Sequence, residues 1–385
     1  MRKFPALAAV LFAAAISAQD HAAHARKIHA ETIGVDSHID TLQRVLIENV
    51  DISRRLTTGH IDLPRLGEGG VRAPFFALWV PTYYKGSEAV RRTLQLRDAM
   101  QRLLDAHPNQ LQLATTASDA ERIARAGMIA AILTIEGGHQ IADDLAVLRM
   151  YHRLGIRSMT LTHFRNNNWA DSSTDTPRHN GLTEFGREVV KEMNRIGMIV
   201  DISHVSDRTF FDALAVATKP VIASHSSCWS LSKVPRNMRD ELIRAVGRNG
   251  GVIGLNFGAG FISQRDADDL MGRITTMAAR EPDLAGKALD AYAAKEHRAE
   301  YHEKAYATLA DVVAHVDHVV KLAGIDHVGI GSDFDGVSSV PAGLEDVSKL
   351  PALTAELLRR GYSETDVKKF LGGNFLRVLR QVTGR

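Results

Sequence analysis

Eight short apolar segments alternate with stretches of helical pattern along this chain, and few folds can accommodate that alternation. The segments are 32–38, 74–80, 130–136, 157–163, 198–204, 220–226, 251–257 and 327–334. Two of the helical stretches, 183–197 and 240–250, end in glycine, which favours a helix C-terminus. Strand and helix alternating eight times predict an α/β fold, a TIM-type (β/α)8 barrel rather than an open sheet.

The length of 385 residues and the apolar fraction of 45% suit one large barrel domain over residues 19–385. One stretch breaks the rhythm: the segment 262–324, before the last predicted strand, is long, charged and interrupted by Pro282. It predicts a helical insertion of one or two outer helices together with the ordinary seventh barrel helix. A lid or an oligomer contact is the alternative.

The first 18 residues have the pattern of a secretory signal peptide. Arg2 and Lys3 precede an apolar run over 4–16, and small residues follow it; the run is too short to span a bilayer comfortably. We therefore expect a signal peptide over 1–18 and a periplasmic or secreted mature protein. An uncleaved signal anchor or a disordered leader is the alternative. Cys228 is the only cysteine, so internal disulfides are excluded.

The formal charge of +2 comes from the leader, because removing Arg2 and Lys3 from the 47 basic residues leaves 45 against 45 acidic ones. The mature chain is thus about neutral and has no basic stripe, which argues against nucleic-acid binding. No further segment has the composition of a membrane span.

Polar residues occur at or near the C-terminal ends of six different predicted strands: His38, Glu136, His163, His204, His225 and Asp333. The C-terminal ends of barrel strands meet at one mouth, where barrel enzymes build their active sites. The first segment also places Asp36, His38 and Asp40 at alternate positions, so these side chains share one face of a strand. The sequence therefore predicts that these residues converge.

Histidines and carboxylates without thiolates suit a hydrolytic site for zinc or another borderline metal. Two neighbouring ions need a carboxylate that contacts both. Glu136 is the best bridge, since it ends an apolar run and precedes two glycines that allow a tight turn. His38 and Asp40 would hold one ion, and His204 and His225 the other. Any one histidine alone could be a core or surface residue bonded to backbone; the set together favours metal.

A family resemblance follows from an ordered set of motifs: "VDSHID", "TIEGG", "LTHFRNNNWADS", "VDISHVS", "IASHSS", "RN" at 236–237 and "VGIGSDFDG". With "HIDLPRLGEGGV" and "LGGNFLRVL", they resemble the membrane (renal) dipeptidase family, peptidase family M19 of the amidohydrolase superfamily, over nearly the whole mature chain. The resemblance implies a barrel of the metal-dependent hydrolase type with two Zn²⁺ per chain, Glu136 bridging. It also implies a dipeptide substrate, including dipeptides with a C-terminal D-residue, and a tendency to form a homodimer.

By this resemblance, the five metal ligands named above match the family's ligand positions. His163 matches the histidine that contacts the substrate and polarises its carbonyl, Arg236 the arginine that receives the substrate carboxylate, and Asp333 the acid/base near the metals. The first motif departs from the family, because Ser37 and Ile39 stand where glycine and asparagine are common. Neither is a ligand position, so the departure concerns the shape of the pocket.

The expected function is hydrolysis of dipeptides by a hydroxide that bridges the two metal ions. Two alternatives remain: deacylation of N-acyl-D-amino acids at the same metals, and a non-catalytic metal-binding protein on the same scaffold. Around the site, we predict Asp36 to be a buried hydrogen-bond partner and Asp335 to fix the loop that follows the last strand.

Overall fold

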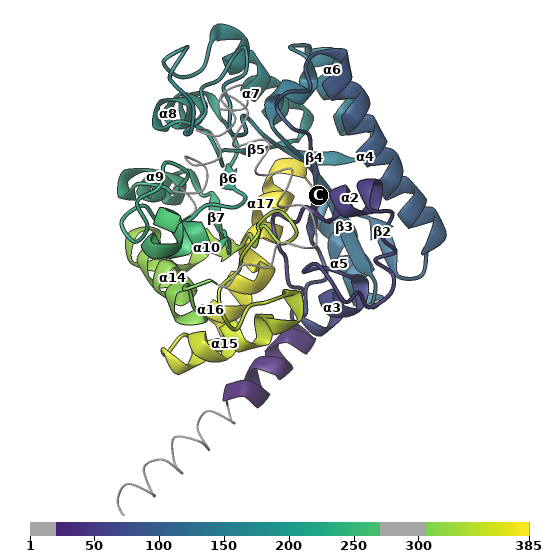
Figure 1. Cartoon of the computed structure of the whole chain (residues 1–385), viewed down its shortest axis with the longest axis vertical. Coiled ribbons are helices and arrows are strands. Elements are labelled where there is room, and N and C mark those ends of the chain that lie inside the picture. Colours follow the sequence, from purple (N-terminus) through teal and green to yellow (C-terminus); the bar gives the residue numbers. More distant parts are fainter. Residues whose placement is uncertain (1–20, 270–304, 385) are drawn as a thin grey trace, which may run out of the picture.

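The computed structural model describes residues 21–269 and 305–384, and in this part of the chain one curled sheet of parallel strands lies inside a layer of helices (Figure 1). Seven strands follow one another in the order β1-β3-β4-β5-β6-β7-β8, and β2 pairs with β3 alone. The strands are β1 Phe75–Trp79, β2 Leu111–Leu113, β3 Ile129–Glu136, β4 Ile156–Thr160, β5 Ile199–Asp201, β6 Ile222–Ala223, β7 Val252–Leu255 and β8 Val328–Ile330.

The first predicted strand, 32–38, is not a regular strand; this prediction was wrong in detail. Instead, isolated parallel bridges join Asp36 to Ile330 and Ile39 to Phe76, so the segment lies between β8 and β1. The Asp36 carboxylate accepts the backbone N–H of His38 at 3.2 Å, and this local side-chain bond interrupts the ladder. The segment nevertheless links both end strands of the curled sheet.

Conversely, β2 was not predicted. Its three residues, Leu111–Leu113, are too few to give a strand periodicity, and pairing with the first half of β3 creates it. The described residues therefore contain eight strands, but not the same eight that the sequence predicts. The seven other predicted strands all contain regular strand residues.

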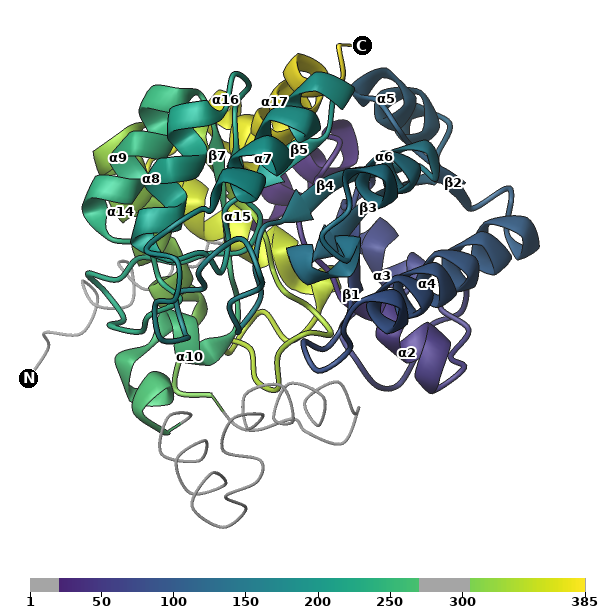
Figure 2. The ribbon, with the colours of Figure 1, turned by 90° about the horizontal axis from the view of Figure 1, so that it is seen from above.

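Helices follow most strands and pack around the sheet (Figure 2). Both helices predicted to end in glycine are present: α7 Glu184–Ile196 and α9 Asp240–Asn249 stop at Gly197 and Gly250, each with a φ of 80° that L side chains rarely adopt. Further helices are α2 Thr41–Ile47, α3 Leu63–Glu68, α4 Ser87–Ala106, α5 Ala117–Arg125, α6 Leu145–Arg153, α8 Asp207–Val216, α10 Ala259–Ile262, α14 Leu309–Ala323, α15 Leu350–Arg359, α16 Glu364–Lys368 and α17 Asn374–Thr383.

The long segment before the last strand is described only in part. It begins where α10 ends at Ile262, and α14 is the helix predicted to precede β8. Residues 270–304, the centre of the predicted insertion, and the predicted signal peptide 1–18 lie outside the described residues. Among the helices that are described, none combines the length and the apolar character needed to cross a membrane.

The C-terminal helix α17 covers the N-terminal ends of several strands. Its Phe375 and Val378 share an apolar cluster with Phe75, Ile199 and Val252, which are the first residues of β1, β5 and β7. Burial of such side chains stabilises the fold by about 25 cal/mol per Å² of apolar surface. Because this end of the sheet is filled, the opposite end, where the strands finish, is the one left for a site.

Candidate metal centre

All eight side chains predicted for the site are buried at the C-terminal ends of the strands. Glu136 is the last residue of β3; His163, His204, His225 and Asp333 follow β4, β5, β6 and β8; His38 and Asp40 belong to the segment between β8 and β1; and Arg236 lies between β6 and α9. Residues spread over most of the chain are thus brought together as the strand pattern predicted.

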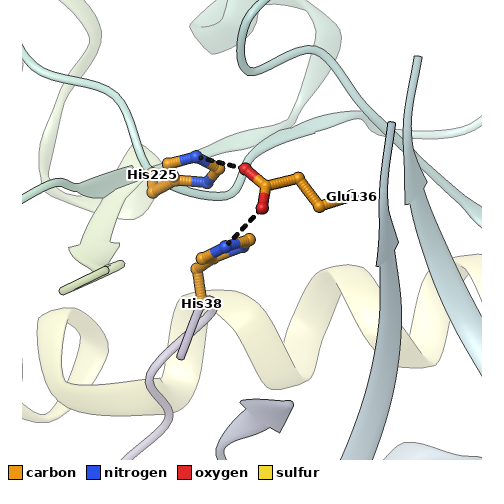
Figure 3. A group of neighbouring side chains, drawn as sticks. All are labelled: His38, Glu136 and His225. Carbon is orange, nitrogen blue, oxygen red and sulfur yellow. Dashed lines mark ion pairs between the residues drawn. The ribbon is translucent and has the colours of Figure 1, made fainter. Parts of the chain in front are cut away.

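Glu136 lies at the middle of the cluster, between His38 and His225 (Figure 3). Its Oε2 is 3.4 Å from His38 Nε2. Its Oε1 faces the other histidines, at 3.1 Å from His225 Nε2, 2.9 Å from His204 Nε2 and 3.7 Å from His163 Nε2. The two carboxylate oxygens therefore face different ligand groups, which is the geometry that a bridging carboxylate needs.

A second group of potential ligands consists of His38, Asp40 and Asp333, whose ligand atoms all lie within 4.8 Å of one another. His38 Nε2 is 3.3 Å from Asp40 Oδ2. Gly336 allows this crowding, because a Cβ at that position would overlap Oδ2 of Asp40 and Oδ1 of Asp333. The glycine of "DFDG" is a sequence signal for such a close approach, but the sequence does not show which side chains approach it.

Several buried polar atoms in the cluster have no hydrogen-bond partner: Nδ1 of His38, Oδ1 of Asp40, Nδ1 of His204 and Nε of Arg236. Leaving such groups unpaired costs about 1–3 kcal/mol each. In addition, Nε2 of His204 and Nε2 of His225 are 2.9 Å apart, so two neutral lone pairs would repel each other unless a proton or a cation lies between them. The donor set therefore fits a bound divalent cation.

The electrostatics separate the histidines into two kinds. Burial lowers the pKa of His204 and of His225 well below the ordinary value, and the positive charges of Arg236 and His38 lower both further. For His38, burial also lowers the pKa, but the negative charges of Glu136 and Asp40 outweigh it and hold this pKa well above the ordinary value. His204 and His225 are thus kept in the neutral form that binds metals.

The pKa of Asp333 is raised to about 6, chiefly by burial and also by the negative charge of Asp40. Its Oδ2 accepts a hydrogen bond of 2.8 Å from the side-chain amide of Asn256, which directly follows β7. The sequence reasoning missed Asn256. The available signal was its position, because Asn256 is a polar residue at the C-terminal end of the seventh apolar segment, as the predicted site residues are at the ends of theirs.

Two residues of the cluster adopt backbone conformations that L residues seldom take. His204 has a φ of 67° and Asp333 a φ of 61°, and neither is a glycine. Such strain costs of order 1–3 kcal/mol per residue and persists only where the surrounding structure over-determines the geometry, as it does at many active sites. The His204 carbonyl accepts the backbone N–H of Ser173 at 2.8 Å, and the Asp333 N–H donates to the His38 carbonyl at 3.1 Å.

The predicted supporting roles are confirmed for two aspartates. Asp36 accepts the backbone N–H groups of His38 and, at 2.9 Å, of Ser332, so it ties the first segment to the last. Asp335 accepts the His60 backbone N–H at 2.6 Å and the Thr41 hydroxyl at 2.7 Å. Asp335 therefore fixes the loop that carries Asp333.

Arg236 is buried behind His225. Its Nη2 donates to the His225 carbonyl at 2.8 Å and its Nη1 to the Ser226 hydroxyl at 3.4 Å, while Nε has no hydrogen-bond partner. Burial lowers the pKa of Arg236 to about 10, which leaves the guanidinium charged at neutral pH. A buried cation beside the cluster is suited to binding an anionic group.

Comparison with known proteins places these observations in a family. The family model described as membrane dipeptidase (Peptidase family M19) matches residues 22–384. Dipeptidase tcpJ from Claviceps purpurea (strain 20.1) is 40% identical over 334 residues, which cover 84% of this chain and 69% of that protein.

Solved structures agree in fold. The probable dipeptidase PvdM from Pseudomonas aeruginosa matches with a TM-score of 0.81 and 26% identity, over 95% of this chain and 99% of that one. A metallo peptidase from Rhodobacter sphaeroides, liganded with a phosphinate mimic of the dipeptide L-Ala-D-Ala, matches with a TM-score of 0.75 and 26% identity, over 91% of this chain and 99% of that one. Because the family model spans nearly the whole chain, the chain belongs to the membrane dipeptidase family, peptidase family M19 of the amidohydrolase superfamily.

Proposed function

We propose that this protein is a zinc dipeptidase with two ions per chain, acting on dipeptides that include those with a C-terminal D-residue. One observation carries the proposal most: the two oxygens of Glu136 face different histidine groups, His38 on one side and His204 with His225 on the other. The R. sphaeroides relative, which is liganded with an L-Ala-D-Ala mimic, supports the choice of substrate. The bridges of Asp36 and Ile39 to both end strands support a closed (β/α)8 barrel around the site.

In this proposal His38 and Asp40 would hold one ion, His204 and His225 would hold the other, and Glu136 would be a ligand of both. When bound, two divalent cations would lower the pKa of water and stabilise the negative charge of a developing oxyanion. The neutral state of His204 and His225, which burial enforces, keeps their lone pairs available for this role.

The remaining residues bind and orient the dipeptide. Arg236 receives the C-terminal carboxylate through its charged guanidinium, which selects short substrates whose carboxylate lies near the scissile bond. His163, whose Nδ1 is 3.4 Å from the indole Nε1 of Trp79, contacts the substrate carbonyl through its other nitrogen. Asp333 takes the proton of the attacking water and returns it to the leaving amine, a role worth roughly 10²–10⁴ in rate.

The first test is metal content per chain by elemental analysis, combined with hydrolysis of L-Ala-D-Ala before and after chelation. We expect close to two ions, loss of turnover on chelation and recovery with zinc. N-acyl-D-alanine serves as the comparison substrate: turnover of it without turnover of the dipeptide would replace the proposed activity by deacylation. A metal-free chain would contradict the proposal altogether.

The role of Asp333 needs a variant that leaves the metal ligands intact. Asp333→Asn should lower dipeptide turnover by roughly 10²-fold or more while metal content stays near two per chain. Loss of one ion in this variant would instead make Asp333 a ligand, as its grouping with His38 and Asp40 allows.

The proposal also includes export, with cleavage near residue 18, and a homodimer as the assembled form. Fractionation of expressing cells followed by N-terminal sequencing tests the first, and light scattering of the purified protein tests the second. Recovery of the protein with an intact leader in the cytoplasmic fraction would contradict export, and a monomeric mass would contradict the dimer.

A further inference from the structure

Asp201, the last residue of β5, is a fully buried carboxylate that contacts no predicted ligand directly. Its Oδ1 accepts two backbone N–H groups, from Ser203 at 3.0 Å and Ser224 at 2.9 Å. Its Oδ2 accepts two hydroxyls, from Thr160 and Ser224, each at 2.5 Å. Four donors from three neighbouring strand ends thus surround one carboxylate, so both of its oxygens are held in fixed directions.

This arrangement decides where the proton of the Ser224 hydroxyl goes. A serine hydroxyl has one proton to donate, and here it points to Oδ2 of Asp201. Oγ of Ser224 also lies 2.8 Å from Nδ1 of His225, and because its proton is already donated to Asp201, it can only accept at this second contact. His225 must therefore carry its proton on Nδ1, and its Nε2 must carry the lone pair.

The lone pair faces the centre of the cluster, where Nε2 of His225 lies 3.1 Å from Oε1 of Glu136. The backbone of His225 is fixed as well: its N–H donates to the Ser203 hydroxyl at 3.1 Å, and its carbonyl accepts from Arg236. His204 offers a contrast, because its Nδ1 has no hydrogen-bond partner. The chain thus fixes the tautomer of one of the two histidines.

We infer that Asp201 is a positioning residue that acts through Ser224 to hold His225 in the Nδ1–H tautomer, and thereby sets the affinity of the centre for a divalent cation. Partners of this kind, in which a carboxylate orients a histidine ligand, typically change metal affinity by 10–100-fold when mutated. The inference rests on the proposed role of His225 as a metal ligand.

The decisive variant is Asp201→Asn, which keeps the shape of the side chain but replaces one acceptor oxygen by an NH₂ group that donates. Its carbonyl oxygen must stay at the Oδ1 position, because the two backbone N–H groups there can only donate. The new NH₂ group then faces Ser224 and donates to its hydroxyl. The hydroxyl proton turns to Nδ1 of His225, which forces the proton of the imidazole onto Nε2 and blocks the metal-binding lone pair.

Two further variants separate positioning from packing. Ser224→Ala removes the hydroxyl that connects Asp201 with His225 but leaves Asp201 in place. Thr160→Val is the matched control, because it deletes a hydroxyl bonded to the same oxygen of Asp201 but not to His225. Melting temperatures of all three variants verify that each is folded.

Zinc affinity is measured by competition with a chromogenic chelator. We expect a loss of roughly 10–100-fold for Asp201→Asn, a loss of roughly 10-fold for Ser224→Ala, and a change under about threefold for Thr160→Val. Equal losses in all three variants would overturn the inference in favour of a packing role for the network.

The tautomer is read directly from the ¹⁵N shifts of the imidazole in the zinc-free protein, with the His225 signals identified by their absence in His225→Gln. The wild-type chain should show the Nδ1–H form and Asp201→Asn the Nε2–H form. An Nε2–H form in the wild type, or wild-type zinc affinity in Asp201→Asn, would overturn this inference alone. A wild-type chain that binds no zinc would overturn the proposed function together with it.

Discussion

Asn256 donates its side-chain amide to Oδ2 of Asp333 at 2.8 Å, and its own Oδ1 accepts the backbone N–H of Gly258 at 2.6 Å. The amide is therefore oriented by the backbone, with its NH₂ group directed at Asp333. The other oxygen of Asp333, Oδ1, is the one that faces Gly336. The direction of the proposed proton acceptor therefore depends on the residue that follows β7 as well as on the segment that follows β8.

Asn256→Asp should lower turnover without removing the metals. The new carboxylate still accepts from Gly258, but it can no longer donate to Asp333 and adds a negative charge beside it. We expect kcat to fall by roughly 10–10²-fold with metal content unchanged, measured by steady-state kinetics and elemental analysis. Unchanged kcat would show that Asp333 needs no orienting partner.

Glu136→Gln should weaken metal binding itself, because an amide offers one acceptor oxygen where the carboxylate offers two. The exposed Glu184 at the start of α7 provides the control variant Glu184→Gln. Elemental analysis after dialysis against a weak chelator should find less metal in Glu136→Gln than in the wild type or the control. Full metal content together with full activity would rule out Glu136 as the bridge.

Gly336→Ala should disrupt the centre, because the added methyl group would overlap the carboxylates of Asp40 and Asp333. Moving these groups by about 1 Å can cost roughly 10²-fold in kcat/KM. Gly67→Ala in α3 is the control, since its added carbon would be 3.6 Å from the nearest atom, in Arg72. Equal kcat/KM in both variants would contradict the close approach at Gly336.

His315 should make the fold sensitive to acid. This buried histidine of α14 accepts the Cys228 backbone N–H at 3.0 Å on Nδ1, and its Nε2 lies 3.0 Å from the Ile262 carbonyl, so it is neutral. Burial lowers its pKa from 6.5 to about 4. Between these two values the unfolded chain binds a proton that the folded chain does not, so the free energy of unfolding falls as the pH falls from 6.5 towards 4.

At pH 5 the loss from this one group, relative to pH 7.5, is about 2 kcal/mol. Urea unfolding of the wild type and of His315→Gln at both pH values measures it. The difference between the two pH values should be smaller in the variant by about that amount. The same pH dependence in both proteins would mean that His315 is not the group that titrates.

Much of the fold and the cluster followed from the sequence. The strands at 74–80 and 130–136 and the helices that end at Gly197 and Gly250 are local features, since apolar runs and glycine stops act over a few residues. The convergence of His38, Glu136 and the later polar residues followed from one rule, that parallel strands end at the same side of a barrel.

The remaining features depend on partners far apart in the sequence, and no local pattern encodes them. His60 and Asp335, whose contact fixes the loop of Asp333, are 275 positions apart. The pairing of β2 with β3 and the bridged form of 34–39 likewise arise from neighbouring chains of the sheet. By itself the sequence determined which chemical groups meet at the strand ends, because residue type and strand order suffice for that. Only the tertiary structure decided the orientation and protonation of these groups. The tautomer of His225 and the direction of Asp333 are set by hydrogen bonds that exist only after the strands have assembled.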